Sequence, residues 1–280
     1  MLIPFTKMHG LGNDFMVLDR VNNSIHLTGE QIRKLADRHF GVGFDQLLVV
    51  DPPSSDNVDF DYRIYNADGN EVEHCGNGAR CFALFVRQHG LTNANPVTVN
   101  TLGGILKLQC NADDTITVNM GEPRLEPEVV PYRTTTRDMV YTLSYQTEHG
   151  VQSVEFSALS LGNPHAVILV EEVDTAPVEQ VGRMLNQHAD FPSGVNVGFM
   201  QITNRHSFRL RVFERGVGET LACGTGACAA AVAGSLRGLL DTTVEASLRG
   251  GKLTISWEQG SNPVFMTGPA CTVFEGRINL

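Results

Sequence analysis

Two stretches of the chain decide the fold: RIYNADGNEVEHC at Arg63–Cys75 and RVFERGVGETLAC at Arg211–Cys223. They align without a gap, 148 residues apart. Both contain an arginine, an aliphatic residue, an aromatic residue, a polar turn, a glutamate (Glu71 or Glu219) and a final cysteine. A match of this length between the two halves of one chain indicates an internal duplication.

The similarity continues beyond the cysteines, where CGNGA starts at Cys75 and CGTGA at Cys223. Further matches occur in the same order at spacings of 147 to 150 residues: Gly12-Asn13 with Gly162-Asn163, Gly103-Gly104 with Gly250-Gly251, and Gly121 with Gly268. A solenoid repeats every 20–50 residues, so this long period predicts two homologous domains instead.

Short alternating segments bounded by turn residues predict a chain dominated by strands. The predicted strands are Asp59–Tyr65, Val97–Thr101, Ile105–Cys110, Thr115–Met120, Ser153–Leu159, His165–Val170, Val197–Thr203, Phe208–Phe213, Thr243–Ser247 and Lys252–Trp257. The predicted helices are Thr28–Phe40, which opens with a Thr-x-x-Gln capping box, Asn77–His89, Pro177–Gln187 and Thr225–Arg237.

The helices that follow the two cysteines are apolar almost all round, which is typical of buried helices. We therefore predict an α+β protein of two homologous domains, each a curled, mainly antiparallel sheet around a central buried helix, with the active site in the cleft between them. The expected domains are residues 1–122 and residues 123–268. The Pro- and Glu-rich segment GEPRLEPEVVP, residues 121–131, is the expected linker.

Composition limits the function. The 280 residues suffice for two domains, and a net charge of −10 gives no basic surface for nucleic acid. No apolar run reaches the ~18 residues of a membrane span, and the start of the chain lacks a signal peptide's apolar stretch. A cytoplasmic protein with no membrane partner is therefore expected. Six cysteines in such a chain favour free, catalytic or metal-binding thiols over disulfides.

The repeated unit has a chemical meaning. Each Cys-Gly-x-Gly begins a helix, where free backbone N–H groups and a partial positive charge favour a carboxylate or a phosphate. The same field is expected to lower the pKa of a thiol at the helix start. Two such thiols, Cys75 and Cys223, on opposite faces of one carbon would remove a proton from one side and return one from the other. This is two-base racemisation or epimerisation, with the helix starts stabilising the developing negative charge.

These residues closely resemble the diaminopimelate epimerase family, whose members need no pyridoxal phosphate. The resemblance covers nearly the whole chain, through KMHGLGNDF, FGVGFDQ, YNADGNEVEHCGNGARC, LGNPHAV and FERGVGETLACGTGACA. Proline racemases also use two thiols as their acid–base pair, but their first motif reads Cys-Gly-His where this chain has Cys75-Gly76-Asn77. The resemblance implies cofactor-free interconversion of LL- and meso-diaminopimelate, a step in lysine and peptidoglycan precursor synthesis.

The resemblance also implies individual roles. Cys75 and Cys223 would be the acid–base pair, with His165 and Glu214 assisting proton transfer. The remaining residues would bind substrate, with Arg215 as the fork for the distal carboxylate: Asn13, Gln46, Asn66, Gly76, Asn77, Asn163, Asn196, Glu214, Arg215, Gly224 and Thr225. The C-terminal strand of family members returns to the first domain, which implies that residues 269–280 join residues 1–122. Family members form homodimers supported by an aromatic residue near the C-terminus, often tyrosine, for which Phe274 is the nearest candidate here.

Other interpretations were weighed against these. A lone cysteine is usually an inert core thiol, which is how we interpret Cys81, Cys110, Cys228 and Cys271. The spacings C-x5-C and C-x4-C with a single His74 do not supply zinc ligand pairs, so no metal is expected. His165 could satisfy a turn, and Glu214 could pair with its neighbour at the surface. The glycine stretches match neither a P-loop nor G-x-G-x-x-G, and none of the four lysines has a cofactor-like setting.

Two functional alternatives remain open at this point. The first is another cofactor-independent racemase or isomerase of the same fold, similar to proline racemase. The second is a protein that clamps a dicarboxylic amino acid between two domains without chemistry, which the presence of both cysteines disfavours.

Overall fold

The computed structural model describes residues 2–73, 75–147 and 150–280. The chain divides into two compact units, Met1–Asn119 with Thr267–Leu280 (unit 1) and Met120–Met266 (unit 2). The elements of unit 1 are β1 Leu2–Gly10, β2 Asn13–Asp19, α1 Gly29–Ala36, β3 Gln46–Asp51, β4 Phe60–Asn66, β5 Glu71–Val72, α2 Gly76–Gln88, β6 Val97–Thr101, β7 Gly104–Cys110, β8 Ile116–Asn119 and β18 Cys271–Asn279.

Unit 2 has a comparable set of elements. These are β9 Tyr141–Thr147, β10 Gly150–Ser160, β11 Pro164–Leu169, α3 Val178–Asn186, β12 Asn196–Asn204, β13 Ser207–Glu214, β14 Gly218–Thr220, α4 Gly224–Leu236, β15 Thr243–Leu248 and β16 Gly251–Ser256. The short strand β17, Phe265–Gly268, spans the division between the units.

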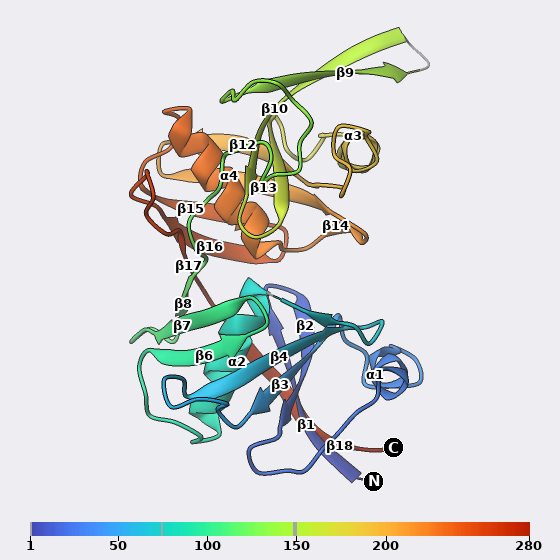
Figure 1. Ribbon diagram of the computed structural model, residues 1–280, viewed down its shortest axis with the longest axis vertical. Helices are drawn as coiled ribbons and strands as arrows, with labels where there is room; N and C mark the ends of the chain where they lie inside the picture. The colour runs from blue at the N-terminus through green and yellow to red at the C-terminus, as the bar shows by residue number, and fades with distance from the viewer. Residues whose placement is uncertain (1, 74, 148–149) are drawn as a thin grey trace. The chain divides into compact units, whose positions relative to one another are not determined.

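Each unit encloses one helix in strands (Figure 1). In unit 1, α2 contacts strands from both ends of the sequence, namely β1, β2, β3, β7, β8 and β18. In unit 2, α4 contacts β10, β11, β12, β13, β15 and β16. α4 has almost no polar face, and α2 exposes only Arg87 and Gln88 in its last turn, so the surrounding strands bury most of both helices.

The second helix of each unit is amphipathic and covers the sheet from outside. Ile32 and Leu35 of α1 join an apolar cluster on β2 and β3. Val181 and Leu185 of α3 join the corresponding cluster on β11 and β12. Each sheet is therefore packed on both sides, which fixes the strand ends that carry the predicted site residues.

Strand pairing repeats in the two units at the spacing of the sequence repeat. β2 pairs parallel to β3 with Phe15 opposite Gln46, and β11 pairs parallel to β12 with His165 opposite Asn196. The next pairs, β3–β4 and β12–β13, are both antiparallel, and the pairs β4–β6 and β13–β15 are both parallel. This common order supports the duplication inferred from the sequence.

The predicted α+β fold class, with a buried helix in each unit, is confirmed. The first strands, β1, β2 and β3, were not among the predicted strands, because their buried runs do not alternate. The helix predicted at Thr28–Phe40 ends at Ala36, although its Thr28–Gln31 capping box is present. Asp37 is extended at the C-cap, and its side chain accepts hydrogen bonds from the next turn instead.

The segment 121–131, the expected linker, follows directly after the division between the units and is bonded within unit 2. Gly121 accepts a hydrogen bond from the Val264 N–H, and Arg124 forms a bridge with Ser160 of β10. Val130 is fully buried in the apolar cluster of unit 2 beneath α3. A segment rich in proline and glutamate is thus held by backbone hydrogen bonds and by the buried side chains of Pro123, Pro127 and Val130.

No helix among the described residues is both long and apolar enough to cross a membrane.

Candidate active site

Cys75 is the N-cap of α2 and lies at the end of the predicted polar turn. Its sulfur accepts a hydrogen bond from the Gly78 N–H at 3.3 Å, in the position that a serine or aspartate oxygen usually takes. The thiol is half-buried and lies 3.7 Å from the Asn13 Oδ1. A thiolate in this place faces a backbone donor and the positive end of the helix, both of which favour its charge.

The start of α2 is held by a buried polar network. Asn77 donates from Nδ2 to the Asn13 Oδ1 at 3.3 Å, and Asn13 donates from Nδ2 to the Asp45 Oδ2 at 2.9 Å. Arg80, which is 0% exposed, donates to the Asn77 Oδ1 at 3.0 Å and to the Pro269 carbonyl at 3.0 Å. The network orients both predicted asparagines at Cys75.

Gln46 and Asn66 lie opposite each other on β3 and β4 and are bonded side chain to side chain. The Gln46 Nε2 donates to the Asn66 Oδ1 at 2.9 Å. The Gln46 Oε1 is buried and accepts no hydrogen bond from the described residues. A buried amide oxygen without a donor is the kind of group that a substrate ammonium satisfies.

Cys223 begins α4 in the same way, but its surroundings differ. Burial, followed by the charge of the Glu214 carboxylate, raises the pKa of the Cys223 thiol well above its ordinary value, against a smaller opposing effect of the Thr225 hydroxyl. The expectation that the helix start lowers this thiol's pKa is therefore wrong at Cys223. Desolvation and a like charge outweigh the helix dipole, so this cysteine is a protonated thiol at neutral pH.

A chain of hydrogen bonds runs from His165 to Cys223. The His165 Nε2 lies 2.9 Å from the Asn163 Oδ1, which only accepts, so Nε2 carries the proton. Asn163 donates from Nδ2 to the Thr225 Oγ1 at 3.3 Å, and that oxygen lies 3.6 Å from the Cys223 sulfur. Thr225 is thereby left with its own proton for the sulfur.

His165 itself is almost completely buried, and burial, with the Arg215 charge as a secondary cause, lowers its pKa to about 3. It is therefore neutral at physiological pH. A neutral imidazole that orients Asn163 agrees with the hydrogen bonds.

Glu214, Arg215 and Asn196 lie at neighbouring strand ends of unit 2. The Thr220 hydroxyl donates to the Glu214 Oε1 at 2.5 Å and holds that carboxylate. The Arg215 N–H donates to the Asn196 Oδ1, and its exposed guanidinium donates to the Ser193 carbonyl through Nη1. The other guanidinium N–H groups include an edge that can bind a carboxylate.

The structure gathers the predicted site residues into two groups, one at the start of each buried helix. In unit 1 these are Asn13, Gln46, Asn66, Cys75, Gly76 and Asn77; in unit 2 they are Asn163, His165, Asn196, Glu214, Arg215, Cys223, Gly224 and Thr225. Sequence reasoning missed Arg80 and Thr220, which orient members of the two groups. Only Arg80 has a signal in the sequence, as a charge within the first turns of a largely apolar helix.

His74, considered as a metal ligand, lies outside the described residues. Within 2–73, 75–147 and 150–280, no three histidine, cysteine, aspartate or glutamate side chains gather in a way that could hold a metal ion.

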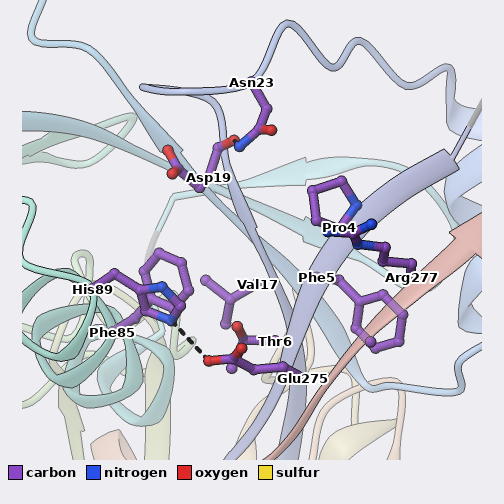
Figure 2. Close-up of a pocket in the computed structure, with 11 residues that line it drawn as sticks. Pro4, Phe5, Thr6, Val17, Asp19, Asn23, Phe85, His89, Glu275 and Arg277 are labelled. Carbon is purple, nitrogen blue, oxygen red and sulfur yellow. Dashed lines mark hydrogen bonds and ion pairs between the residues drawn. The ribbon is translucent and has the colours of Figure 1, made fainter.

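A pocket of about 380 Å³ lies elsewhere on unit 1, between β1, β2, the end of α2 and β18. Figure 2 shows His89 and Glu275 approaching each other across it, 3.5 Å apart from Nε2 to Oε1. The residues lining this pocket include none of the predicted site residues. It is therefore separate from the cysteine that unit 1 contributes.

Solved structures share the fold. A hydroxyproline epimerase from Agrobacterium vitis, solved with trans-4-hydroxy-L-proline, superposes with a TM-score of 0.69 at 17% identity, over 99% of this chain and 92% of that one. A phenazine biosynthesis protein of the PhzF family from Bacillus anthracis also reaches 0.69 at 17% identity, over 100% of both chains. At these identities the likeness concerns the fold alone.

Sequence comparisons identify the family. The family model described as Diaminopimelate epimerase matches residues 5–126 and 157–273. A diaminopimelate epimerase from Cupriavidus pinatubonensis (strain JMP 134 / LMG 1197) is 54% identical over 283 residues, covering 100% of this chain and 98% of the relative. One from Teredinibacter turnerae (strain ATCC 39867 / T7901) is 53% identical over 280 residues and 100% of both. The chain therefore belongs to the diaminopimelate epimerase family.

Proposed function

We propose that this chain interconverts LL-2,6-diaminopimelate and meso-diaminopimelate, without a cofactor, by moving the proton of one α-carbon between two thiols. The observation that carries the proposal is the pair of matched helix starts, each with a cysteine at its N-cap. The full-length similarity to curated relatives of that name supports the substrate.

In the proposed reaction, one thiolate takes the α-proton and the other thiol donates its S–H proton to the opposite face. The electron pair of the broken C–H bond is held in the planar carbanion until it forms the new C–H bond, so atoms and charge balance. The two thiols exchange roles with each turnover. The mechanism requires Cys75 and Cys223 to approach one α-carbon from opposite faces.

The free N–H groups at the two helix starts bind the α-carboxylate. Gly76 and Asn77 would present them from α2, and Gly224 and Thr225 from α4. As negative charge spreads onto this carboxylate during proton removal, the helix dipoles stabilise it more than they stabilise the ground state.

The remaining polar side chains would bind different charged groups of the substrate. Asn13, Gln46 and Asn66 belong to unit 1, where the unsatisfied Gln46 Oε1 suits an ammonium. The Arg215 guanidinium would bind the distal carboxylate of the substrate. The Asn196 Oδ1 accepts a hydrogen bond from the backbone N–H of Arg215 and so holds the backbone of Arg215 in place. Glu214 beside Cys223 disfavours a thiolate there and so keeps the proton on that sulfur.

The first experiment is proton exchange in heavy water. Reduced protein free of pyridoxal phosphate is incubated with LL-diaminopimelate, and the α-protons are followed by NMR. We expect deuterium at one centre together with the meso isomer. Cys75→Ala and Cys223→Ala should each lose epimerisation, whereas Cys271→Ser, which alters an exposed thiol, should retain it. A fully active Cys75→Ala or Cys223→Ala protein would refute the two-thiol mechanism.

We also propose a homodimer that acts in the cytoplasm, where a reducing environment keeps both thiols available. Val273 and Phe274 of β18 are 54% and 47% exposed, an apolar surface that a second copy could cover. Phe274 packs edge-to-face on Phe5 with ring centroids 5.9 Å apart. Sedimentation equilibrium should report a dimer that Phe274→Glu weakens; a monomer at all protein concentrations would refute it.

A further inference from the structure

The hydroxyl of Tyr62 is a buried polar group that the reaction described above does not use. Tyr62 lies on β4 and is 1% exposed, with its ring against that of Phe82 of α2, 4.5 Å between centroids. Among the described residues, its hydroxyl has no hydrogen-bond partner. Buried donors are nearly always satisfied, so an exception calls for a reason.

The hydroxyl lies directly against the first turn of α2. A Cβ atom built on Gly78 would come within 2.5 Å of the Tyr62 oxygen, so glycine is needed here to leave it room. Gly78 is the residue whose N–H donates to the Cys75 sulfur at 3.3 Å. The hydroxyl therefore lies beside the backbone that supports this sulfur.

Cys75 and Tyr62 also interact electrostatically. Burial raises the pKa of the Tyr62 hydroxyl well above its ordinary value, and negative charge on Cys75 raises it further. Negative charge on the sulfur thus favours the protonated hydroxyl, which is the form that can donate a hydrogen bond.

Packing alone does not require the hydroxyl. Phenylalanine would fill the same space without burying an unpaired donor. At the equivalent place in unit 2, 148 residues further on, stands Leu210, which is 2% exposed and apolar. Gly226 of α4, the counterpart of Gly78, has the apolar side chain of Val212 as its neighbour. The repeated fold therefore forms without a tyrosine hydroxyl at the equivalent sequence position in unit 2.

We propose that Tyr62 is a positioning residue that donates its hydroxyl proton in a hydrogen bond to the helix-start sulfur of Cys75 whenever that sulfur carries negative charge. The bond would form by a small movement of the first turn of α2 and would stabilise the thiolate in addition to the Gly78 N–H. This inference rests on the proposed role of Cys75 as a proton acceptor, but its test needs no substrate.

Several other ionisable groups lie near this helix start, and none is altered by the test. Cys81, in the next turn of α2, is fully buried and interacts electrostatically with Cys75. The charged groups on α2 are Arg80 near its start and Arg87 in its last turn. Other titratable groups on the neighbouring strands and loops include Glu73, His9, Lys7 with its partner Asp14, and Asp45, which is bonded to Asn13.

The test measures the ionisation of Cys75 directly. Intact, reduced protein is treated with iodoacetamide from pH 5 to pH 10, and the alkylation rate of Cys75 is read by peptide mass spectrometry. Tyr62→Phe should shift the midpoint of this profile upward by about one pH unit, the effect of losing one hydrogen bond to a charged sulfur. The pH profile of kcat/KM for Tyr62→Phe should move upward by the same amount.

Tyr132→Phe is the matched control, because it removes another largely buried tyrosine hydroxyl, in the apolar cluster of unit 2. It should leave the Cys75 profile unchanged. Circular dichroism checks that both variants fold. An unshifted profile in folded Tyr62→Phe, or an equal shift in Tyr132→Phe, would overturn the proposal. A shift in Tyr62→Phe without any diaminopimelate exchange by the parent protein would support the hydroxyl's role and reject the proposed function.

Discussion

His165 makes a quantitative prediction about stability and pH. Its imidazole is 1% exposed, and burial lowers its pKa from 6.5 to about 3 in the folded protein. In the unfolded chain the His165 imidazole takes up a proton near pH 6.5, whereas in the folded chain it stays neutral down to about pH 3. The stabilisation from the neutral imidazole is thus complete above pH 6.5 and is lost as the pH falls toward 3.

The magnitude follows from these two values. The full difference of about 3.5 pKa units corresponds to roughly 5 kcal/mol. Between pH 7 and pH 5, only the unfolded state protonates, which lowers the free energy of unfolding by about 2 kcal/mol through this one group. The variant His165→Gln lacks the group, so its free energy of unfolding should fall by about 2 kcal/mol less over the same interval.

Urea denaturation at pH 7 and pH 5, followed by fluorescence, measures this difference. The single tryptophan, Trp257, is 3% exposed and belongs to unit 2, as His165 does, so its emission reports the relevant unit. His206→Gln, which removes an imidazole that is 77% exposed, serves as the control and should behave like the parent. Equal pH dependence in the parent and in His165→Gln would refute the assignment of His165 as a buried neutral group.

Three further changes test the helix starts. Arg80→Met leaves the buried Asn77 Oδ1 and the partly buried Pro269 carbonyl without a charged donor and should destabilise by roughly 2–4 kcal/mol in urea denaturation followed by circular dichroism; parent-like stability would contradict the network. Gly78→Ala brings a methyl group within 2.5 Å of the Tyr62 oxygen and should cost about 1–3 kcal/mol, less in a Tyr62→Phe background, as a double-mutant cycle would measure. Thr225→Val removes the hydroxyl 3.6 Å from the Cys223 sulfur and should lower kcat about tenfold or more. Circular dichroism should show a folded protein, and a folded variant with the parent's kcat would contradict a role of this hydroxyl in the reaction.

Much of the architecture could be predicted because the sequence contains the same pattern of residues twice. The two Cys-Gly-x-Gly segments begin helices at Gly76 and Gly224, and both helices are buried as their composition indicates. Local patterns of this kind depend on neighbouring residues only. The strands β1 and β18 could not be paired by such reasoning, since Leu2 lies opposite Asn279 at the other end of the chain.

The fine structure of the site was beyond sequence reasoning for a different reason. Residue types predict what a side chain can do, but the pKa of a thiol depends on its burial and on charges brought close by distant segments. Cys223 illustrates this, because the helix start alone favours a thiolate, whereas the folded unit buries the sulfur beside Glu214. The role of Arg80 likewise depends on Pro269, almost two hundred residues further along the chain.

The difference between the two cysteines is what a two-base reaction needs at its start. If both sulfurs were thiolates, neither could donate a proton, and if both were thiols, neither could accept one. Duplication supplies two equivalent positions, and later substitutions around them can separate their proton affinities. Both sulfurs accept from a backbone N–H, that of Gly78 at Cys75 and that of Gly226 at Cys223. The surroundings differ because Cys223 is also fully buried beside the Glu214 carboxylate, whereas Cys75 is only half-buried. Under the proposed mechanism, the higher proton affinity of Cys223 would make it the proton donor in one direction of the reaction, and the two thiols would exchange roles in the other.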